Sequence, residues 1–181
     1  LPICVHVHAV MAPKMRMLAF YSVGYDCVDV DAANERGVLI VHSPTESNWG
    51  GVAEGTVANM LAILKKVREK DRHVKSGGWR DNSLKGNFLG SRHMDNHPGM
   101  TLGIVGLGRI GQEVAKRAIA FQMRVIGFDP FLSAEQATKL GIERAERVAD
   151  MLPRVDYLTV HTPLTAETKY LVGVKEIEVL K

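Results

Sequence analysis

A glycine-rich run in the second half of the chain is the clearest candidate for binding chemistry. It reads Gly106-Leu107-Gly108-Arg109-Ile110-Gly111. Gly106 would permit a tight turn from strand to helix, Gly108 would let the backbone approach a pyrophosphate, and Gly111 would let the helix pack closely on the strand. The helix that begins at Arg109 and Ile110 would offer unpaired N–H groups to the phosphates. This pattern is typical of a dinucleotide-binding turn.

An acidic residue follows at the spacing that such a turn needs. Asp129 stands 18 residues after Gly111, at the end of the next apolar run. Its carboxylate would accept hydrogen bonds from ribose hydroxyls and would repel a 2′-phosphate, so we expect NAD rather than NADP as the cofactor. Two alternatives stay open at this point: turn glycines without any ligand, or another nucleotide such as FAD or an adenosyl cofactor.

Polar residues also follow a third apolar run, in the order His161-Thr162-Pro163. Ligands of open parallel sheets bind at the carboxyl ends of the strands. We expect His161 to line the adenine side of a cofactor cleft. A role as catalytic base is the less favoured interpretation, because no carboxylate at a recognisable spacing would orient the imidazole.

Two pairs of histidines have spacings that a metal site could use. His93 and His97 are four residues apart, but the Pro98-Gly99 pair that follows predicts a loop rather than a helix. His6 and His8 alternate on an expected strand, where a surface position is favoured. We therefore predict no metal site.

The candidate residues need a scaffold of alternating strands and helices. Strands are predicted over residues 101–105, 124–128 and 155–160, with one helix from Arg109 and another capped by Ser133 and ended by Gly141. The strands are nearly continuous apolar runs. Such runs, separated by helices, indicate an α/β fold with a parallel sheet covered on both faces.

The first half of the chain predicts a smaller strand–helix–strand unit, followed by a long helix. The two strands are expected over residues 15–22 and 37–41, with a short helix over 30–36 between them. An amphipathic run predicts one helix over about 53–76, ended by Gly77-Gly78. The loop-like stretch 79–100 follows it, and loops of this length usually have a functional or contact role.

The composition is that of an ordinary globular protein. Hydrophobic residues make up 46% of the 181 positions and cysteine only 2 of them, which excludes disordered and disulfide-rich classes. The apolar runs are only as long as strands, well short of the roughly 20 residues of a membrane span, which excludes membrane-spanning classes. The net charge of +3 is concentrated in residues 65–75. A solvated helix face is favoured there over nucleic-acid binding, because no aromatic residues are interleaved. With no readable targeting segment and cysteines interpreted as reduced, we expect a cytoplasmic protein.

Five sequence blocks together resemble the D-isomer-specific 2-hydroxyacid dehydrogenase family, which includes phosphoglycerate dehydrogenases and glyoxylate or hydroxypyruvate reductases. The blocks are Ser22 to Val30, Gly51 to Glu54, Thr101 to Gly111, Phe128 to Pro130, and His161 to Thr168. The resemblance implies an NAD-dependent oxidoreductase that acts on a small 2-hydroxy or 2-oxo acid. It also implies an incomplete Rossmann-type doubly wound parallel sheet in residues 47–181, and the remnant of a flavodoxin-like substrate domain in residues 1–46.

The resemblance assigns roles to individual residues. Ser22, Val23 and Gly24 resemble the turn whose N–H groups bind the substrate carboxylate. The helix over about 53–76 resembles the family's interdomain helix, which implies a homodimer. The positions that resemble the family's cofactor contacts are Arg109, Ile110, Asp129, Thr162, Pro163 and Thr168.

The sequence departs from the family pattern in one respect. In the family, the Arg that anchors the substrate carboxylate and the His–Glu pair that handles the proton lie downstream of the helix corresponding to residues 174–181. No residue of this chain is therefore assigned a catalytic role, and we expect a chain truncated at both ends and inactive alone. The alternative is a non-catalytic NAD-sensing scaffold, similar to dehydrogenase-like transcriptional corepressors. Which 2-hydroxy acid is used stays open.

Overall fold

The computed structural model describes residues 14–25, 27–94 and 96–180. Internal contacts divide the chain into two units, residues 1–48 and residues 49–181. None of the helices in the described ranges has both the length and the apolar character needed to cross a lipid bilayer. The candidate residues 22–24 lie in the first unit, and the glycine-rich turn lies in the second.

The first unit is a small strand–helix–strand motif. It contains β1 (Met17–Phe20), α2 (Val30–Glu35) and β2 (Leu39–His42). The two strands pair in parallel, and α2 contributes the fully buried Ala33. Asp29 caps the helix by accepting a hydrogen bond from the Ala32 N–H at 2.9 Å. Gly37, with a φ of 65°, follows the helix in the left-handed conformation that glycine adopts readily. The predicted elements of this unit are confirmed.

The second unit alternates helices and strands around a larger sheet. In chain order its elements are α3 (Glu46–Leu64, which begins in the first unit), α4 (Val67–Lys75), η1 (Asn82–Leu84), β3 (Thr101–Val105), α5 (Arg109–Ala120), β4 (Arg124–Phe128), α6 (Ala134–Leu140), β5 (Glu143–Arg144), α7 (Val148–Met151), η2 (Leu152–Arg154), β6 (Tyr157–Val160) and α8 (Val174–Glu178). The strand order is β5-β4-β3-β6, and every pair is parallel. The predicted α/β fold with parallel strands is confirmed.

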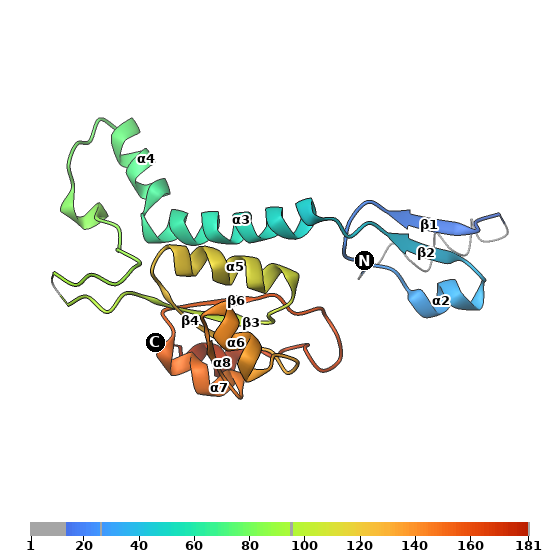
Figure 1. Cartoon of the computed structure of the whole chain (residues 1–181). Helices are drawn as coiled ribbons and strands as arrows, with labels where there is room; N and C mark the ends of the chain where they lie inside the picture. The colour runs from blue at the N-terminus through green and yellow to red at the C-terminus, as the bar shows by residue number, and fades with distance from the viewer. Residues whose placement is uncertain (1–13, 26, 95, 181) are drawn as a thin grey trace. The chain divides into compact units, whose positions relative to one another are not determined.

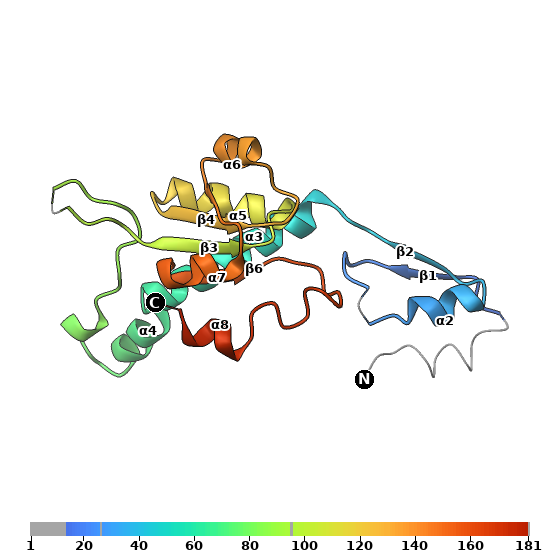
Figure 2. The ribbon, with the colours of Figure 1, turned by 90° about the horizontal axis from the view of Figure 1, so that it is seen from below.

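Apolar side chains form a cluster on each face of this sheet. Leu102 and Ile104 of β3 join a cluster with residues of α3 and α5, which lie together over one face (Figure 1). Val105 joins the second cluster with Met151 of α7 and Leu152 of η2. The helix α7 lies on the side of the sheet that faces the viewer in Figure 2. Alternate residues of a strand point to opposite faces, and both faces of this sheet are covered. All five residues of β3 are therefore buried.

The prediction of one helix over about 53–76 is wrong in two respects. The helical structure begins earlier, at Glu46, and it breaks after Leu64, so that α3 and α4 are separate helices. Lys66 at the break has a φ of 52°, in the left-handed region, which interrupts the helical hydrogen-bond ladder. The apolar positions beyond the break are not core positions: Val67 is 53% exposed and Val74 is 62% exposed.

Candidate cofactor site

The glycine-rich turn connects β3 to α5, as predicted, and two of its glycines are required by close packing. Gly106 has a φ of 90°, and a Cβ atom there would lie 2.7 Å from the carbonyl oxygen of His161. At Gly111 a Cβ atom would lie only 2.0 Å from the carbonyl oxygen of Gly106. Neither position can accept a side chain without moving backbone, so the turn and the first turn of α5 are held tightly together.

Gly108 is different, because the protein itself does not require a glycine there. A Cβ atom at this position would meet no protein atom within 4 Å, and its φ of −69° suits any residue. Gly108 is the N-cap of α5, and no side chain of the described residues caps this helix end. The first turn of α5 also carries no acidic residue. Open space beside free helical N–H groups fits the phosphates of a nucleotide.

The carboxylate of Asp129 lies at this turn. One of its oxygens accepts a hydrogen bond from the Leu107 N–H at 2.8 Å, and the other accepts one from the Phe131 N–H at 2.9 Å. Parallel pairing of β3 with β4 brings the two strand ends together, which explains how a residue distant in sequence reaches the turn. The predicted acid and the predicted glycine turn therefore lie next to each other.

His161 and Thr162 follow β6 and lie against the same turn. The backbone N–H of His161 donates to the Val105 carbonyl at 2.7 Å, and the Thr162 methyl would lie 3.0 Å from a Cβ atom at Gly106. The imidazole Nε2 of His161 is hydrogen-bonded to the Thr159 hydroxyl at 2.9 Å. Burial lowers the pKa of this imidazole below its ordinary value, so the ring is neutral near pH 7.

Pro163 and Thr168 belong to a loop that leaves this end of the sheet. The Thr168 hydroxyl donates to the Pro163 carbonyl and accepts from the Thr165 N–H at 2.8 Å. Pro163 is exposed, whereas Thr168 is half-buried. The two predicted cleft residues are thus joined to each other by hydrogen bonding.

An aromatic residue that sequence reasoning missed also lies beside the turn. The guanidinium carbon of Arg109 lies 4.8 Å from the centre of the Trp49 ring, in a cation–π arrangement. Trp49 is half-buried on α3, and no spacing in the sequence links it to Arg109. The contact becomes visible only once α3 and α5 pack on the same face of the sheet.

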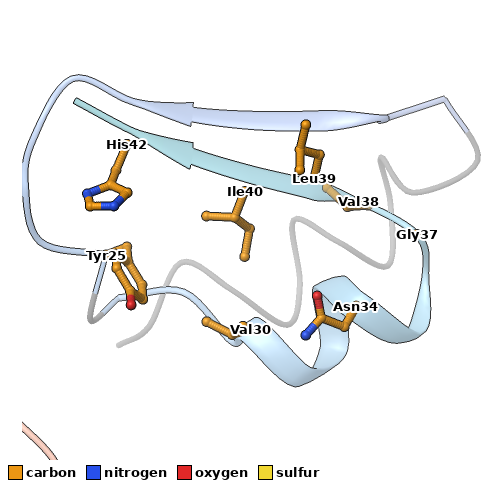
Figure 3. A pocket seen from close by; sticks show the side chains of 8 residues that line it. All are labelled: Tyr25, Val30, Asn34, Gly37, Val38, Leu39, Ile40 and His42. Carbon is orange, nitrogen blue, oxygen red and sulfur yellow. The ribbon is translucent and has the colours of Figure 1, made fainter. Parts of the chain in front are cut away.

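The Ser22–Gly24 turn of the first unit follows β1 and is exposed. The Ser22 hydroxyl donates to the Gly24 carbonyl at 2.8 Å, and His42 Nδ1 donates to the Val23 carbonyl at 3.0 Å. The His42 ring packs edge-on against Tyr25, with the ring centres 5.3 Å apart. Both rings line one end of a cavity of about 530 Å³ between β2 and α2 (Figure 3). Hydrogen bonds within the first unit therefore hold the turn in place.

Of the two histidine pairs, only His93 and His97 lie in the described part of the chain. Arg92 and His97 form an isolated antiparallel bridge, so His97 is paired with Arg92 and does not share a helix with His93. Across the described residues, no three His, Cys, Asp or Glu side chains come together as metal ligands do. His6 and His8 lie outside the described residues.

Comparison with known proteins gives a consistent family. Residues 57–181 match the model of the D-isomer specific 2-hydroxyacid dehydrogenase NAD binding domain. The D-3-phosphoglycerate dehydrogenase of Methanocaldococcus jannaschii is 38% identical over 94% of this chain and 31% of its own length. The glyoxylate reductase of Thermococcus litoralis is 35% identical over 94% of this chain and 50% of its own. This chain thus spans about a third to a half of the length of these relatives.

Solved structures agree with that comparison. The D-lactate dehydrogenase of Aquifex aeolicus, complexed with NAD and lactic acid, has a TM-score of 0.80 at 27% identity and covers 97% of this chain and 50% of its own. The TT0316 protein of Thermus thermophilus has a TM-score of 0.82 at 34% identity, with 99% of this chain and 54% of its own covered. The relatives named for an activity are dehydrogenases and a reductase, so the alternative of a non-catalytic scaffold gains no support.

Proposed function

Because this chain belongs to the D-isomer-specific 2-hydroxyacid dehydrogenase family, we propose that its protein is an NAD-dependent oxidoreductase that interconverts a small 2-hydroxy acid and the corresponding 2-oxo acid. NAD, when bound, supplies the hydride chemistry. Residues 47–181 hold the cofactor in this proposal, and residues 1–46 belong to the domain that binds the substrate.

The observation that carries the proposal is the open space at Gly108. Two of the three glycines of the turn are explained by packing inside the protein, but the third is not, because a side chain there would touch nothing in the fold. A glycine that the fold does not need is explained by a ligand that approaches the backbone closely. The uncapped N-terminus of α5 beside it suits a negatively charged group such as a pyrophosphate.

The remaining site residues divide the binding of the cofactor. The N–H groups of Arg109 and Ile110, with the Arg109 guanidinium, bind the pyrophosphate, while Gly106 and Gly111 keep the backbone close. The Asp129 carboxylate binds the ribose hydroxyls, and its charge disfavours the 2′-phosphate of NADP. The cleft beyond β6 is lined by His161, Thr162, Pro163 and Thr168.

The substrate side of the proposal rests on the exposed turn of the first unit. The N–H groups of Ser22, Val23 and Gly24 hold the carboxylate of the 2-hydroxy acid. We assign the proton-transfer role to none of the residues in this chain, and the neutral His161 serves only as a cleft residue. The protein is further proposed to be cytoplasmic and to form a homodimer. The apolar side chains Ile63, Val67 and Val74, which are exposed along α3 and α4, support the dimer.

Calorimetric titration of the 181-residue chain tests the cofactor part of the proposal. NADH is expected to bind at least about tenfold more tightly than NADPH, because one unfavourable carboxylate–phosphate contact changes affinity by that order. FAD and S-adenosylmethionine serve as comparison ligands. Failure to bind NADH, or tighter binding of either comparison ligand, would refute the cofactor assignment.

Turnover tests the activity itself. The product of the complete coding sequence is expected to oxidise NADH with at least one of glyoxylate, hydroxypyruvate and pyruvate. The 181-residue chain is expected to oxidise no NADH with any of them. Enzyme-like turnover by this chain would show that it contains the proton-transfer residues.

A further inference from the structure

The contact between Trp49 and Arg109 joins the first residue of α5 to the helix that precedes the sheet. The guanidinium carbon lies 4.8 Å from the centre of the indole ring, within the range of a cation–π interaction. Arg109 is exposed, whereas Trp49 is half-buried. The contact therefore places an exposed, charged side chain against a half-buried aromatic ring, directly beside the open space at Gly108.

We infer that Trp49 is a positioning residue, which holds the Arg109 guanidinium ready for the pyrophosphate of the cofactor. The inference rests on the proposed function, because it takes the glycine-rich turn to be the cofactor site. It adds a residue that the glycine motif does not contain and that lies on a different helix.

The geometry of an arginine on an aromatic ring explains how Trp49 would hold Arg109 and still leave its N–H donors available. A ring face interacts with the face of the planar guanidinium, whereas the N–H donors of arginine point outward in the plane of the group. A guanidinium held in this way keeps its donors available for phosphate oxygens. It also loses less side-chain freedom on binding than an arginine that moves freely in solvent.

The ion pairs on α5 also support this role for Arg109. Within the described residues Arg109 forms no ion pair, whereas Arg117 on the same helix contacts both Glu113 at 2.7 Å and Glu54 at 3.5 Å. An arginine whose donors already bind carboxylates is less available to an anion. Arg109 contacts an aromatic ring instead, and this contact leaves its charge without a carboxylate partner among the described residues.

If Trp49 has a purely structural role, its replacement should affect stability and NADH affinity differently. Trp49 precedes Ala53, Val57, Met60 and Leu64, the buried residues of α3, at the spacing of one helix face. If the indole only extends this packed face, its removal lowers stability and affects NADH affinity independently of Arg109. A double-mutant cycle separates the two roles.

The experiment is calorimetric titration of NADH into the 181-residue chain and its Trp49→Leu, Arg109→Met and double variants. We expect Trp49→Leu to weaken NADH binding by about threefold to tenfold, and to have no further effect once Arg109 is replaced. Trp49→Phe, which keeps a ring face, should bind within about twofold of the wild-type chain. Trp79→Leu is the matched control and should leave the affinity unchanged.

Two outcomes overturn the inference: wild-type affinity in Trp49→Leu, or the same loss from Trp49→Leu with and without Arg109. If the wild-type chain does not bind NADH, the proposed function fails instead, so the two failures are distinguishable. Thermal unfolding shows whether each variant is folded.

A second series keeps the test decisive if Trp49→Leu does not fold. In a Trp79→Phe background, Trp49 is the only tryptophan of the chain and can be replaced by indoles with increasing numbers of fluorine atoms. Fluorine withdraws electron density from the ring face with little change in shape, so NADH affinity should fall along the series. A constant affinity would overturn the inference.

Discussion

The carboxylate of Asp129 accepts a hydrogen bond from the backbone N–H of Leu107, with an N···O distance of 2.8 Å. This bond joins the end of β4 to the glycine-rich turn after β3. The residue proposed to bind the ribose is therefore also a part of the turn proposed to bind the pyrophosphate. Changes at Asp129 should affect both the cofactor preference and the stability of the fold.

Asp129→Ala is expected to weaken NADH binding by about tenfold to a hundredfold, since hydrogen bonds to a charged group contribute about 1.5–3 kcal/mol. The NADPH affinity should fall less or rise, because the charge that repels the 2′-phosphate is gone. The free energy of unfolding should fall by about 1–3 kcal/mol, since two backbone N–H groups lose their acceptor. Titration with both cofactors and chemical denaturation measure these effects.

Asp150→Ala is the control for this variant, because Asp150 is an aspartate of the same unit that pairs with Arg147 away from the turn. It should leave both cofactor affinities unchanged. An unaltered NADH-to-NADPH ratio in Asp129→Ala would contradict the role assigned to the Asp129 carboxylate.

Alanine substitutions at two glycines of the turn should have opposite effects. Gly108→Ala should change the free energy of unfolding by less than about 1 kcal/mol, because the new Cβ meets no protein atom, but should weaken NADH binding by about tenfold or more. Gly111→Ala should instead destabilise the fold by about 3 kcal/mol, because its Cβ overlaps the Gly106 carbonyl oxygen. Denaturation and titration of both variants would be compared. Normal NADH affinity in a folded Gly108→Ala chain would speak against a ligand at this position.

The half-buried ring of His161 should make stability depend on pH. Its pKa is lowered in the folded chain by burial, whereas in the unfolded chain it should lie near the usual value of about 6.5. As the pH falls through that value, the unfolded chain binds a proton that the folded chain does not, so stability falls. The denaturation midpoint should therefore drop more between pH 7.5 and pH 5.5 in the wild type than in His161→Asn. An equal drop in both chains would exclude this contribution.

The sequence predicts best the elements whose signals are local. Ser133 accepts a hydrogen bond from the Gln136 N–H at the start of α6, and Gly141 ends that helix with a φ of 71°. Both effects act within a few residues of the chain, so spacing alone reveals them. The same holds for the glycine-rich turn and for Asp129, because the strand–helix–strand pattern places them together.

The break between α3 and α4 could not be predicted in this way. The charged and apolar residues keep a helical pattern across Lys66, and a lysine in the left-handed region is uncommon. The structure shows partners distant in sequence at the break: the Lys66 ammonium donates to the carbonyl of Ser83 in η1 at 2.7 Å, and that of Lys65 donates to the Asn87 carbonyl. The contact of Trp49 with Arg109 could not be predicted for a related reason, because the two residues lie on different helices. Strand β5, with two residues, is too short for any periodic signal.

The central position of β3 has a consequence for the rate at which its backbone exchanges hydrogen with solvent. Its neighbours β4 and β6 pair with it on both sides, and all five of its residues are buried. Because each N–H of a strand bonds only one neighbour, the amides of β3 exchange as a set only when the sheet opens on both sides, which is close to global unfolding. In deuterium-exchange mass spectrometry, peptides covering residues 101–105 should be the slowest in the second unit to exchange. Equal or faster exchange there than in the edge strand β6 would show that the sheet opens from its centre.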